Sequence, residues 1–191
     1  METSRRYAFV FILSASLLVG CSGSALRPGT IQASSSTGAS EAIIDAFYSF
    51  DSIRLKKALQ PAASAIPKIV FYQGWAQGGN YRIVERKPCR QGSESDVVCA
   101  ITVKDDLIGA LGINFNVTDT FRISFSGKTV SNVRTTSNDP PEFHEAFEWV
   151  QRERQDLIRK PCEGFFDGGP TPGDCVRAMV RGFAEFASRK R

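Results

Sequence analysis

The sequence predicts an α+β fold in which helices and strands occupy separate stretches of the chain. Apolar residues recur at helical spacing between residues 41 and 78, and the pattern then changes to the two-residue alternation of strands over residues 81–134. Helical spacing returns over residues 139–158 and again over residues 175–188. Because the strands follow one another with only a short helical turn among them, we expect N-terminal helices packed on a curved antiparallel sheet, with additional C-terminal helices.

The first 20 residues are typical of an export signal rather than of a folded domain. Arg5 and Arg6 precede Tyr7–Val19, a run of thirteen residues without a charge. This length fits the apolar region of a secretory signal, and it is shorter than the roughly 20 residues that a membrane-spanning helix needs. The segment Leu18-Val19-Gly20-Cys21 ends the run and resembles the lipobox of bacterial lipoproteins.

The lipoprotein resemblance implies a lipid anchor. It implies cleavage before Cys21, a diacylglyceryl group on the cysteine sulfur, and an acyl chain such as palmitate on the new amino terminus. One acyl chain binds a bilayer marginally, whereas two or three hold stably. We therefore expect a cell-envelope protein attached to a membrane through Cys21: the outer membrane if the host has one, otherwise the outer face of the cytoplasmic membrane. The alternatives are an ordinary signal peptide, or an uncut helix with a chance cysteine.

The domain organisation that follows has three parts. Residues 1–20 form the signal peptide, residues 21–40 form the lipidated cysteine and a flexible tether, and residues 41–191 form a single α+β domain. Ser22–Ser40 holds six serines, three glycines and two threonines, a composition that buries too little apolar surface to offset the entropy of ordering.

Charge gives little indication of a partner. Without Arg5, Arg6 and Glu2, the chain keeps 22 basic and 19 acidic residues, a net charge of +3. The basic residues are scattered, so we expect no nucleic-acid partner.

The cysteine count supports an exported protein. Of the five cysteines, lipidation of Cys21 leaves four, which is an even set for an oxidising compartment. Four cysteines allow three pairings, and the local geometry favours Cys89–Cys99 across a hairpin and Cys162–Cys175 around a Gly/Pro-rich loop. Metal binding is the rival interpretation, but there is no C-x-x-C pair and only one histidine, so we expect no metal and no cofactor.

The helical stretches have recognisable ends. We expect helices over residues 41–50, 51–59 and 67–78, with Asp51 as the N-cap of the second and Gly78-Gly79 ending the third. Asp105 is expected to cap a helical turn that Gly112 closes. Two further helices are expected, over residues 139–158 with Asp139 as an acidic N-cap, and over residues 175–188.

The strands are expected over residues 81–86, 97–103, 113–126 and 129–134. In the third of these, Phe121, Ile123 and Phe125 alternate with polar residues, which indicates a sheet with one buried face.

Several segments carry a resemblance to a known family. They are Ala46-Phe47-Tyr48…Asp51…Leu55…Leu59, Asp105-Asp106-Leu107…Ala110-Leu111-Gly112, and Thr120-Phe121-Arg122-Ile123…Gly127-Lys128-Thr129…Val133. They resemble the nuclear transport factor 2-like superfamily, also called SnoaL-like, over about residues 41–136. The resemblance implies a cone-like pocket between a curved sheet and a long helix. It implies no reaction, because enzymes, carriers and scaffolds share this shape. The C-terminal helices depart from the compact pattern and could cover the mouth of the cone.

The candidate site residues favour binding over catalysis. Tyr72 and Trp75 are the best candidates for lining an apolar pocket, although both fit equally a packed core. His144 shares a helix face with polar residues, which indicates a solvated histidine. For a carboxylate on the inner face of a strand, which would favour an enzyme, the pattern offers only Glu85, and Glu85 has charged neighbours. We therefore expect no catalytic residue and a non-catalytic binding or interaction domain, whose partner is an envelope protein or a small apolar ligand. The alternative is a small enzyme of the epoxide-hydrolase or ketosteroid-isomerase kind.

Overall fold

The computed structural model describes residues 35–92, 95–164 and 173–190. They belong to one compact unit that spans Ala33–Arg191. The expected signal peptide, Cys21 and the tether as far as residue 34 lie outside the described residues.

The helices that precede the sheet are α1 (Ser36–Phe47), α2 (Ser52–Ala58), a short 3-10 helix η1 (Gln60–Ala65) and α3 (Ile66–Gly78). The expected cap of the second helix is confirmed, because the Asp51 carboxylate accepts hydrogen bonds from the backbone N–H groups of Ile53 and Arg54 at 2.9 and 3.1 Å.

The expected start of the domain at residue 41 is wrong by five residues. The Ser35 hydroxyl accepts a hydrogen bond from Gly38 N at 3.1 Å, so α1 begins at Ser36. Ser40 is buried, and its hydroxyl donates to the carbonyl of Ser36 at 2.8 Å. Composition suggested a tether here, because serine is common both in flexible segments and at helix starts.

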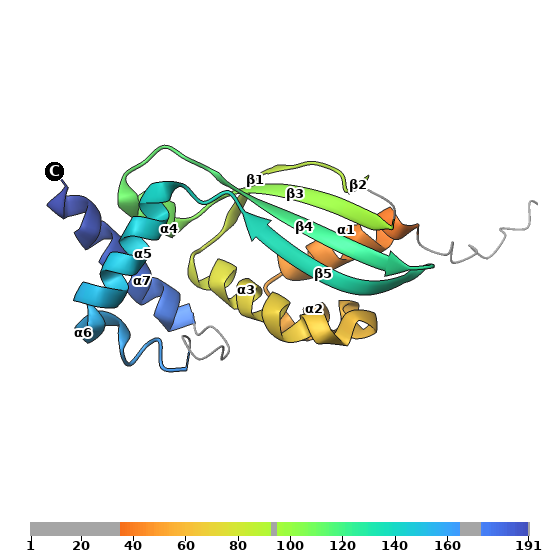
Figure 1. The fold of residues 1–191 in the computed structure, drawn as a ribbon, viewed down its shortest axis with the longest axis horizontal. Helices are drawn as coiled ribbons and strands as arrows, with labels where there is room; N and C mark the ends of the chain where they lie inside the picture. The colour runs from red at the N-terminus through yellow and green to blue at the C-terminus, as the bar shows by residue number, and fades with distance from the viewer. Residues whose placement is uncertain (1–34, 93–94, 165–172, 191) are drawn as a thin grey trace, which may run out of the picture. The chain divides into compact units, whose positions relative to one another are not determined.

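The sheet is antiparallel, with the order β1-β3-β4-β5 and with β2 also paired to β3. Its strands are β1 (Arg82–Arg86), β2 (Arg90–Gln91), β3 (Asp96–Lys104), β4 (Val117–Ser126) and β5 (Thr129–Ser137). The α1, α2 and α3 helices cover one face (Figure 1). Two boundaries differ from expectation by more than one residue: β4 begins at residue 117 rather than 113, and β5 ends at residue 137 rather than 134, because it stays paired until Ser137 lies opposite Asp119.

The remaining helices are α4 (Asp106–Leu111), α5 (Pro141–Glu153), α6 (Gln155–Ile158) and α7 (Gly173–Arg189), and they gather at one end of the sheet (Figure 1). The expected roles at α4 are confirmed: Asp105 accepts a hydrogen bond from Ile108 N at 2.8 Å, and Gly112 closes the turn with φ 74°. Among the described residues, no helix is both long and apolar enough to cross a membrane.

The expected helix over residues 139–158 is corrected in two respects. Arg154, with φ −126° and ψ 42°, separates α5 from α6, and Pro140 rather than Asp139 is the N-cap residue. Asp139 instead accepts a hydrogen bond from the Ser137 hydroxyl at 3.0 Å, which keeps its side chain on the sheet side of the helix start.

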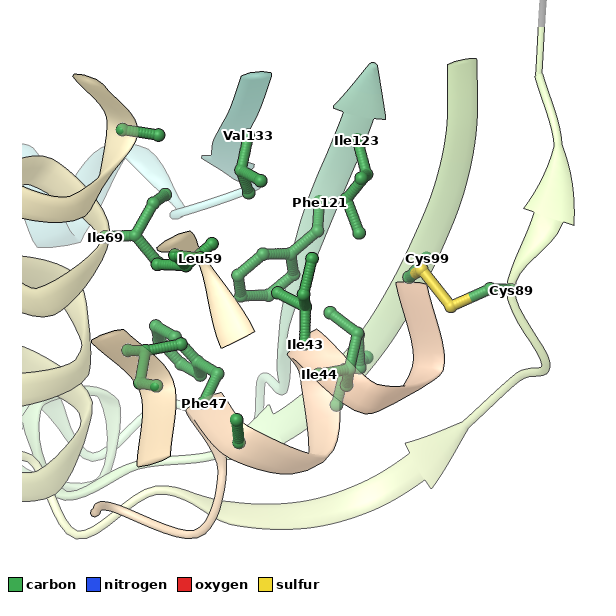
Figure 2. Close-up of a cluster of buried hydrophobic side chains, with 14 of the residues drawn as sticks. Ile43, Ile44, Phe47, Leu59, Ile69, Cys89, Cys99, Phe121, Ile123 and Val133 are labelled. Carbon is green, nitrogen blue, oxygen red and sulfur yellow. A yellow bond between two sulfur atoms is a disulfide. The ribbon is translucent and has the colours of Figure 1, made fainter. Parts of the chain in front are cut away.

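Two apolar clusters hold these elements together. The first lies between the N-terminal helices and the sheet, where Phe47 of α1 meets Phe121 of β4 edge to face, with ring centroids 4.9 Å apart (Figure 2). The second joins α4, α5, α6 and α7, around buried Val150, Met179 and Phe183. Phe143 is packed against both clusters, so the two cores adjoin at α5.

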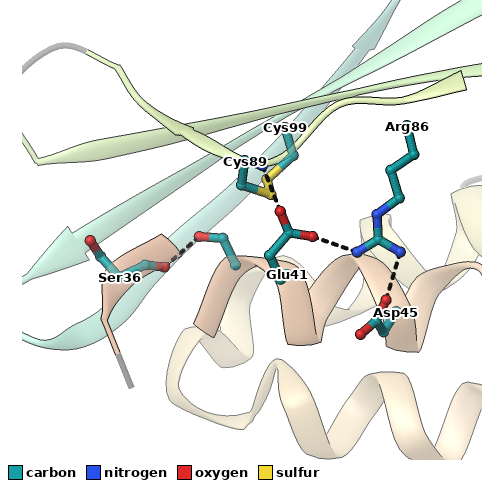
Figure 3. A network of polar contacts seen from close by, with 7 residues as sticks. Ser36, Glu41, Asp45, Arg86, Cys89 and Cys99 are labelled. Carbon is teal, nitrogen blue, oxygen red and sulfur yellow. Dashed lines mark hydrogen bonds and ion pairs between the residues drawn. A yellow bond between two sulfur atoms is a disulfide. The ribbon is translucent and has the colours of Figure 1, made fainter. Parts of the chain in front are cut away.

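Both expected disulfides are present. The Cys89 and Cys99 sulfurs lie 2.00 Å apart, and those of Cys162 and Cys175 lie 2.07 Å apart. Glu41 of α1 ties the first bridge to the helix layer: one carboxylate oxygen accepts from Cys89 N at 2.5 Å and the other accepts from Arg86 (Figure 3).

Candidate functional site

A cavity of about 340 Å³ opens between the covered face of the sheet, α3 and α5. Its wall takes Phe47 from α1, Asp119 from β4, and the end of β5 from Thr135 to Ser137. Helix α5 contributes Phe143, His144 and Phe147 to the wall.

Half of the described residues in the wall carry the ring of a phenylalanine, tyrosine or tryptophan. Seven aromatic residues line the cavity: Phe47, Phe71, Tyr72, Trp75, Tyr81, Phe143 and Phe147. Several of these rings pack against one another. The ring centroids of Trp75 and Phe147 lie 6.1 Å apart, and the Phe143 ring stacks on that of Phe147 with the centroids 6.3 Å apart. Such contacts fix ring orientation and leave a rigid apolar surface.

A buried carboxyl group interrupts this apolar wall. Asp119 is 8% exposed, and its Oδ2 accepts a hydrogen bond of 2.8 Å from the Tyr48 hydroxyl. Burial raises the pKa of Asp119 to about 7, and the repulsion of Asp139 and Asp105 adds to this, whereas the hydrogen bond from Tyr48 acts in the opposite direction. Asp119 therefore changes its charge near neutral pH.

The two tyrosines beside Asp119 stay protonated. Burial raises the pKa of Tyr48 above its ordinary value, and the negative charge of Asp119 raises it further. Burial likewise raises the pKa of Tyr81, followed by the charges of Asp119, Asp105 and Asp139, while a hydrogen bond with Trp75 lowers it. Tyr48 is thus a hydrogen-bond donor to Asp119 at all physiological pH values.

Two further carboxyl groups approach the same end of the cavity. Burial raises the pKa of Asp105 to about 6, against the lowering effect of the hydrogen bonds that cap α4. Burial also raises the pKa of Asp139, against the hydrogen bond from Ser137 and the charge of His144. The chain has therefore brought three acidic side chains from β4 and from the starts of α4 and α5 close to one another.

The predicted pocket residues lie together. Tyr72 and Trp75, both half-buried, line the cavity, and Trp75 also contacts the aromatic rings of α5. His144 is exposed, as expected, but its ring also borders the cavity and meets Phe143 edge to face at 5.6 Å. Glu85 is exposed beside Lys87 and is not part of the lining. The strand carboxylate that the sequence pattern offered as a candidate therefore does not belong to the site.

Asp119 is the residue that sequence reasoning missed. The signal was in the strand alternation, because Asp119 stands two residues before Phe121 and therefore faces the same side of β4. An acidic residue at an inward position of a strand is unusual enough to mark a candidate site.

The described residues contain no group of three or more histidine, cysteine, aspartate or glutamate side chains placed to hold a metal ion. The three carboxyl groups near the cavity interact at longer range and are held separately, by Tyr48, by the N-terminus of α4 and by Ser137. The arrangement can bind a small molecule, orient it by a few polar contacts, and exchange a proton with it at Asp119.

No protein-family model, no curated protein and no solved structure matches this chain.

Proposed function

We propose that this chain is a lipid-anchored protein of the cell envelope whose folded domain binds a small, largely apolar molecule in the aromatic cavity. The observation that carries the proposal is the cavity itself. It is concave, its volume of about 340 Å³ suits a small ligand, and its apolar lining is interrupted by few polar groups. Ligand sites in proteins typically combine these features.

The polar groups suggest how a ligand would be oriented. The rings of Phe47, Trp75 and Phe143 offer apolar contact, and the Tyr48–Asp119 pair offers a hydrogen-bonding end. Because Asp119 is buried, a polar group of the ligand that reached it would form its bond away from bulk water, where such a bond is strong.

The cysteines support the envelope location. Four of the five are paired in the two disulfides, and such bridges persist in oxidising compartments. The cysteine left over is Cys21, the residue that the lipobox resemblance assigns to the anchor. A nuclear transport factor 2-like domain is the corresponding proposal for the fold family, supported by the helices that cover one face of an antiparallel sheet.

Filling the cavity tests the binding function. Thr135 lies on β5, lines the cavity and is half-buried, so Thr135→Phe places a ring in the space that a ligand would occupy. The control is Ser131→Phe, an exposed position on the same strand outside the lining. Aromatic residues are tolerated in strands, so both variants are expected to fold.

The measurement is the fluorescence of N-phenyl-1-naphthylamine, a neutral apolar probe that brightens in dry sites. We expect saturable binding to the wild type and to Ser131→Phe, and at least about tenfold weaker binding to Thr135→Phe. Equal binding to all three proteins, or no saturable binding to the wild type, would contradict the proposal.

The anchor is tested separately. Labelled fatty acid should enter the wild-type protein at Cys21, and Cys21→Ser should release the protein from membranes or leave its signal uncleaved. A wild-type protein with a free, ordinary amino terminus and unchanged membrane partitioning would rule out the lipid anchor.

A second candidate function, acid–base catalysis in the same cavity, is favoured by the pKa of Asp119. A general acid or base is most effective when its pKa lies near the working pH, and the pKa of this carboxyl is about 7. The test is turnover of epoxide, ester or enone substrates by the wild type and by Asp119→Asn. If Asp119→Asn reduces turnover by 10²-fold or more with folding intact, catalysis rather than binding is the function. Absence of turnover in wild type and variant alike leaves binding as the function.

A further inference from the structure

We propose that the ligand of the aromatic cavity is an organic cation, an amine or alkylammonium carried on a small apolar body. This inference rests on the binding function proposed above and specifies the chemical class of the ligand. It depends on two independent features of the wall, its aromatic faces and its charge.

The aromatic rings come from three directions. Tyr72 and Trp75 lie on α3, Phe143 and Phe147 lie on α5, and Phe47 lies on α1. A cation within about 6 Å of a ring centroid is attracted by the negative face of the ring, most strongly when it has lost its water. Outside the lining, Lys68 Nζ lies 5.8 Å from the centroid of the Tyr72 ring, which is within the range of such an attraction.

The charge of the lining is one-sided. Asp119 and Asp139 border the cavity, and Asp105 lies close enough to influence both Asp119 and Tyr81. None of the residues that the structure places in the lining is a lysine or an arginine, and His144 at the exposed rim is the basic residue among them.

This combination leaves an electrostatic cost that a cation would relieve. Burial disfavours the ionised forms of Asp119 and Asp139, and repulsion by Asp139 and Asp105 adds to this effect at Asp119. A positive ligand group in the cavity offsets both effects at once, whereas a neutral hydroxyl would bond to one carboxylate and leave the repulsion in place. An anion would increase it. Among small apolar ligands, the cavity therefore selects for positive charge.

A series of three small molecules of similar shape isolates the charge. Choline carries a trimethylammonium group, 3,3-dimethylbutan-1-ol is its neutral carbon analogue, and 3,3-dimethylbutanoate is an anion with the same tert-butyl group. Each is titrated against N-phenyl-1-naphthylamine bound to the mature chain at pH 8. The protein carries both disulfides and Cys21→Ser, so that no detergent competes for the cavity.

We expect the affinity of choline, measured by displacement of the probe, to be at least about tenfold higher than that of the alcohol, and the affinity of the anion to be the lowest of the three. Asp119→Asn keeps the shape of the side chain and an acceptor for Tyr48, and it should reduce the preference for choline severalfold while the affinity for the alcohol stays constant. The matched control is Asp156→Asn, an exposed position on α6 outside the cavity, which should leave the preference unchanged.

The pH dependence of the wild type gives a test that needs no variant. Because the pKa of Asp119 is about 7, the preference for choline should fall several-fold between pH 8 and pH 5.5, as the carboxylate gains a proton. The titratable groups around Asp119 are Tyr48 after α1, Tyr81 before β1, Asp105 before α4, and Asp139 with His144 at the start of α5. Within this range the tyrosines stay neutral, and protonation of Asp105 or Asp139 would weaken cation binding in the same direction.

The outcomes separate the inference from the function. If the alcohol or the anion displaces the probe as well as choline does, or if choline does not displace it, the proposal that the ligand is a cation is wrong, whereas the proposed binding function is unaffected. If the probe shows no saturable binding to the wild type, both the cation proposal and the binding function are wrong. A preference for choline that survives in Asp119→Asn and at pH 5.5 would also overturn the assignment.

Discussion

At the scale of single residues, the distinctive feature is a carboxyl group on the covered face of a sheet. Asp119 occupies a position in β4 where the alternation places apolar side chains, and Tyr48, which follows α1, donates to it at 2.8 Å. The sequence could have indicated that Asp119 faces inward. It could not indicate the partner, because Tyr48 is 71 residues away and meets Asp119 only when α1 packs on the sheet.

The cost of this carboxyl can be measured as stability. Its pKa is raised from 3.8 to about 7, so the folded state holds the proton more tightly than the unfolded chain does. The stability that the protonated form of Asp119 contributes is therefore fully present below pH 3.8 and is lost as the pH rises through 7. The loss amounts to up to about 4 kcal/mol, at 1.36 kcal/mol for each pKa unit. Asp119→Asn should remove this loss, so the variant should become increasingly more stable than the wild type between pH 4 and pH 8.

Urea unfolding at several pH values checks the expectation. Asp156→Asn serves as the control, because this exposed side chain has a pKa that its partner Arg154 lowers, and the substitution should bring no gain at pH 8. A wild type more stable than Asp119→Asn at pH 8 would show that Asp119 is ionised and well compensated in the folded protein.

At the scale of elements, the close contact between α5 and α7 positions one side of the cavity. Gly182 of α7 is buried against Val150 of α5, and a Cβ built at Gly182 would lie 2.5 Å from Val150 Cγ2. The branched Val150 side chain has few other rotamers in a helix, so it cannot easily move aside. Gly182 therefore sets how closely the two helices approach.

Two glycine substitutions, which we expect to change the stability of the protein in opposite directions, test this contact. Gly182→Ala should destabilise the protein by about 1–3 kcal/mol through overpacking, despite the better helix propensity of alanine. Gly109→Ala in α4 is the matched control, since a Cβ there meets nothing within 4 Å and the site is exposed; it should stabilise by about 0.5–1 kcal/mol. Thermal unfolding measures both, and Val150→Ala should relieve the strain of Gly182→Ala. A neutral Gly182→Ala would contradict the close contact.

The elements also show where sequence patterns stop being informative. The capping aspartates at residues 51 and 105 were predicted because their partners lie within three residues. The end of β5 at Ser137 was missed, because Thr135 to Ser137 have no apolar alternation and are strand only through pairing with β4. Those three residues line the cavity, so the missed boundary concealed part of the site.

At the scale of the whole molecule, the folded unit contains two apolar cores that adjoin beside the cavity, and each includes a disulfide. Cys89–Cys99 belongs to the core under the sheet, and Cys162–Cys175 belongs to the core of the C-terminal helices. The α+β class and both pairings could be predicted from the sequence, since they depend on local period and short loops. Of the cavity, only Tyr72 and Trp75 were predicted, because its walls come from α1, α3, β4, β5 and α5, and their packing is not local.

The second disulfide gives a prediction at this scale. Its cysteines are 13 residues apart, and closing a loop of this length stabilises a protein by about 3 kcal/mol in the loop-entropy description. The double substitution Cys162→Ala and Cys175→Ala should therefore lower the free energy of unfolding by about this amount. Cys21→Ser, which removes a cysteine outside both bridges, should leave it unchanged. Chemical denaturation measures the three proteins, and equal stabilities would show that this bridge does not constrain the chain.

The most direct test of a ligand-binding envelope protein is to identify what the cavity holds. The native protein is incubated with an extract of its own cells, separated rapidly by gel filtration and denatured, and the released small molecules are analysed by mass spectrometry. We predict that wild type and Ser131→Phe release the same enriched small molecule, and that Thr135→Phe, whose cavity is filled, does not. Identical sets of molecules from wild type and Thr135→Phe would contradict the account.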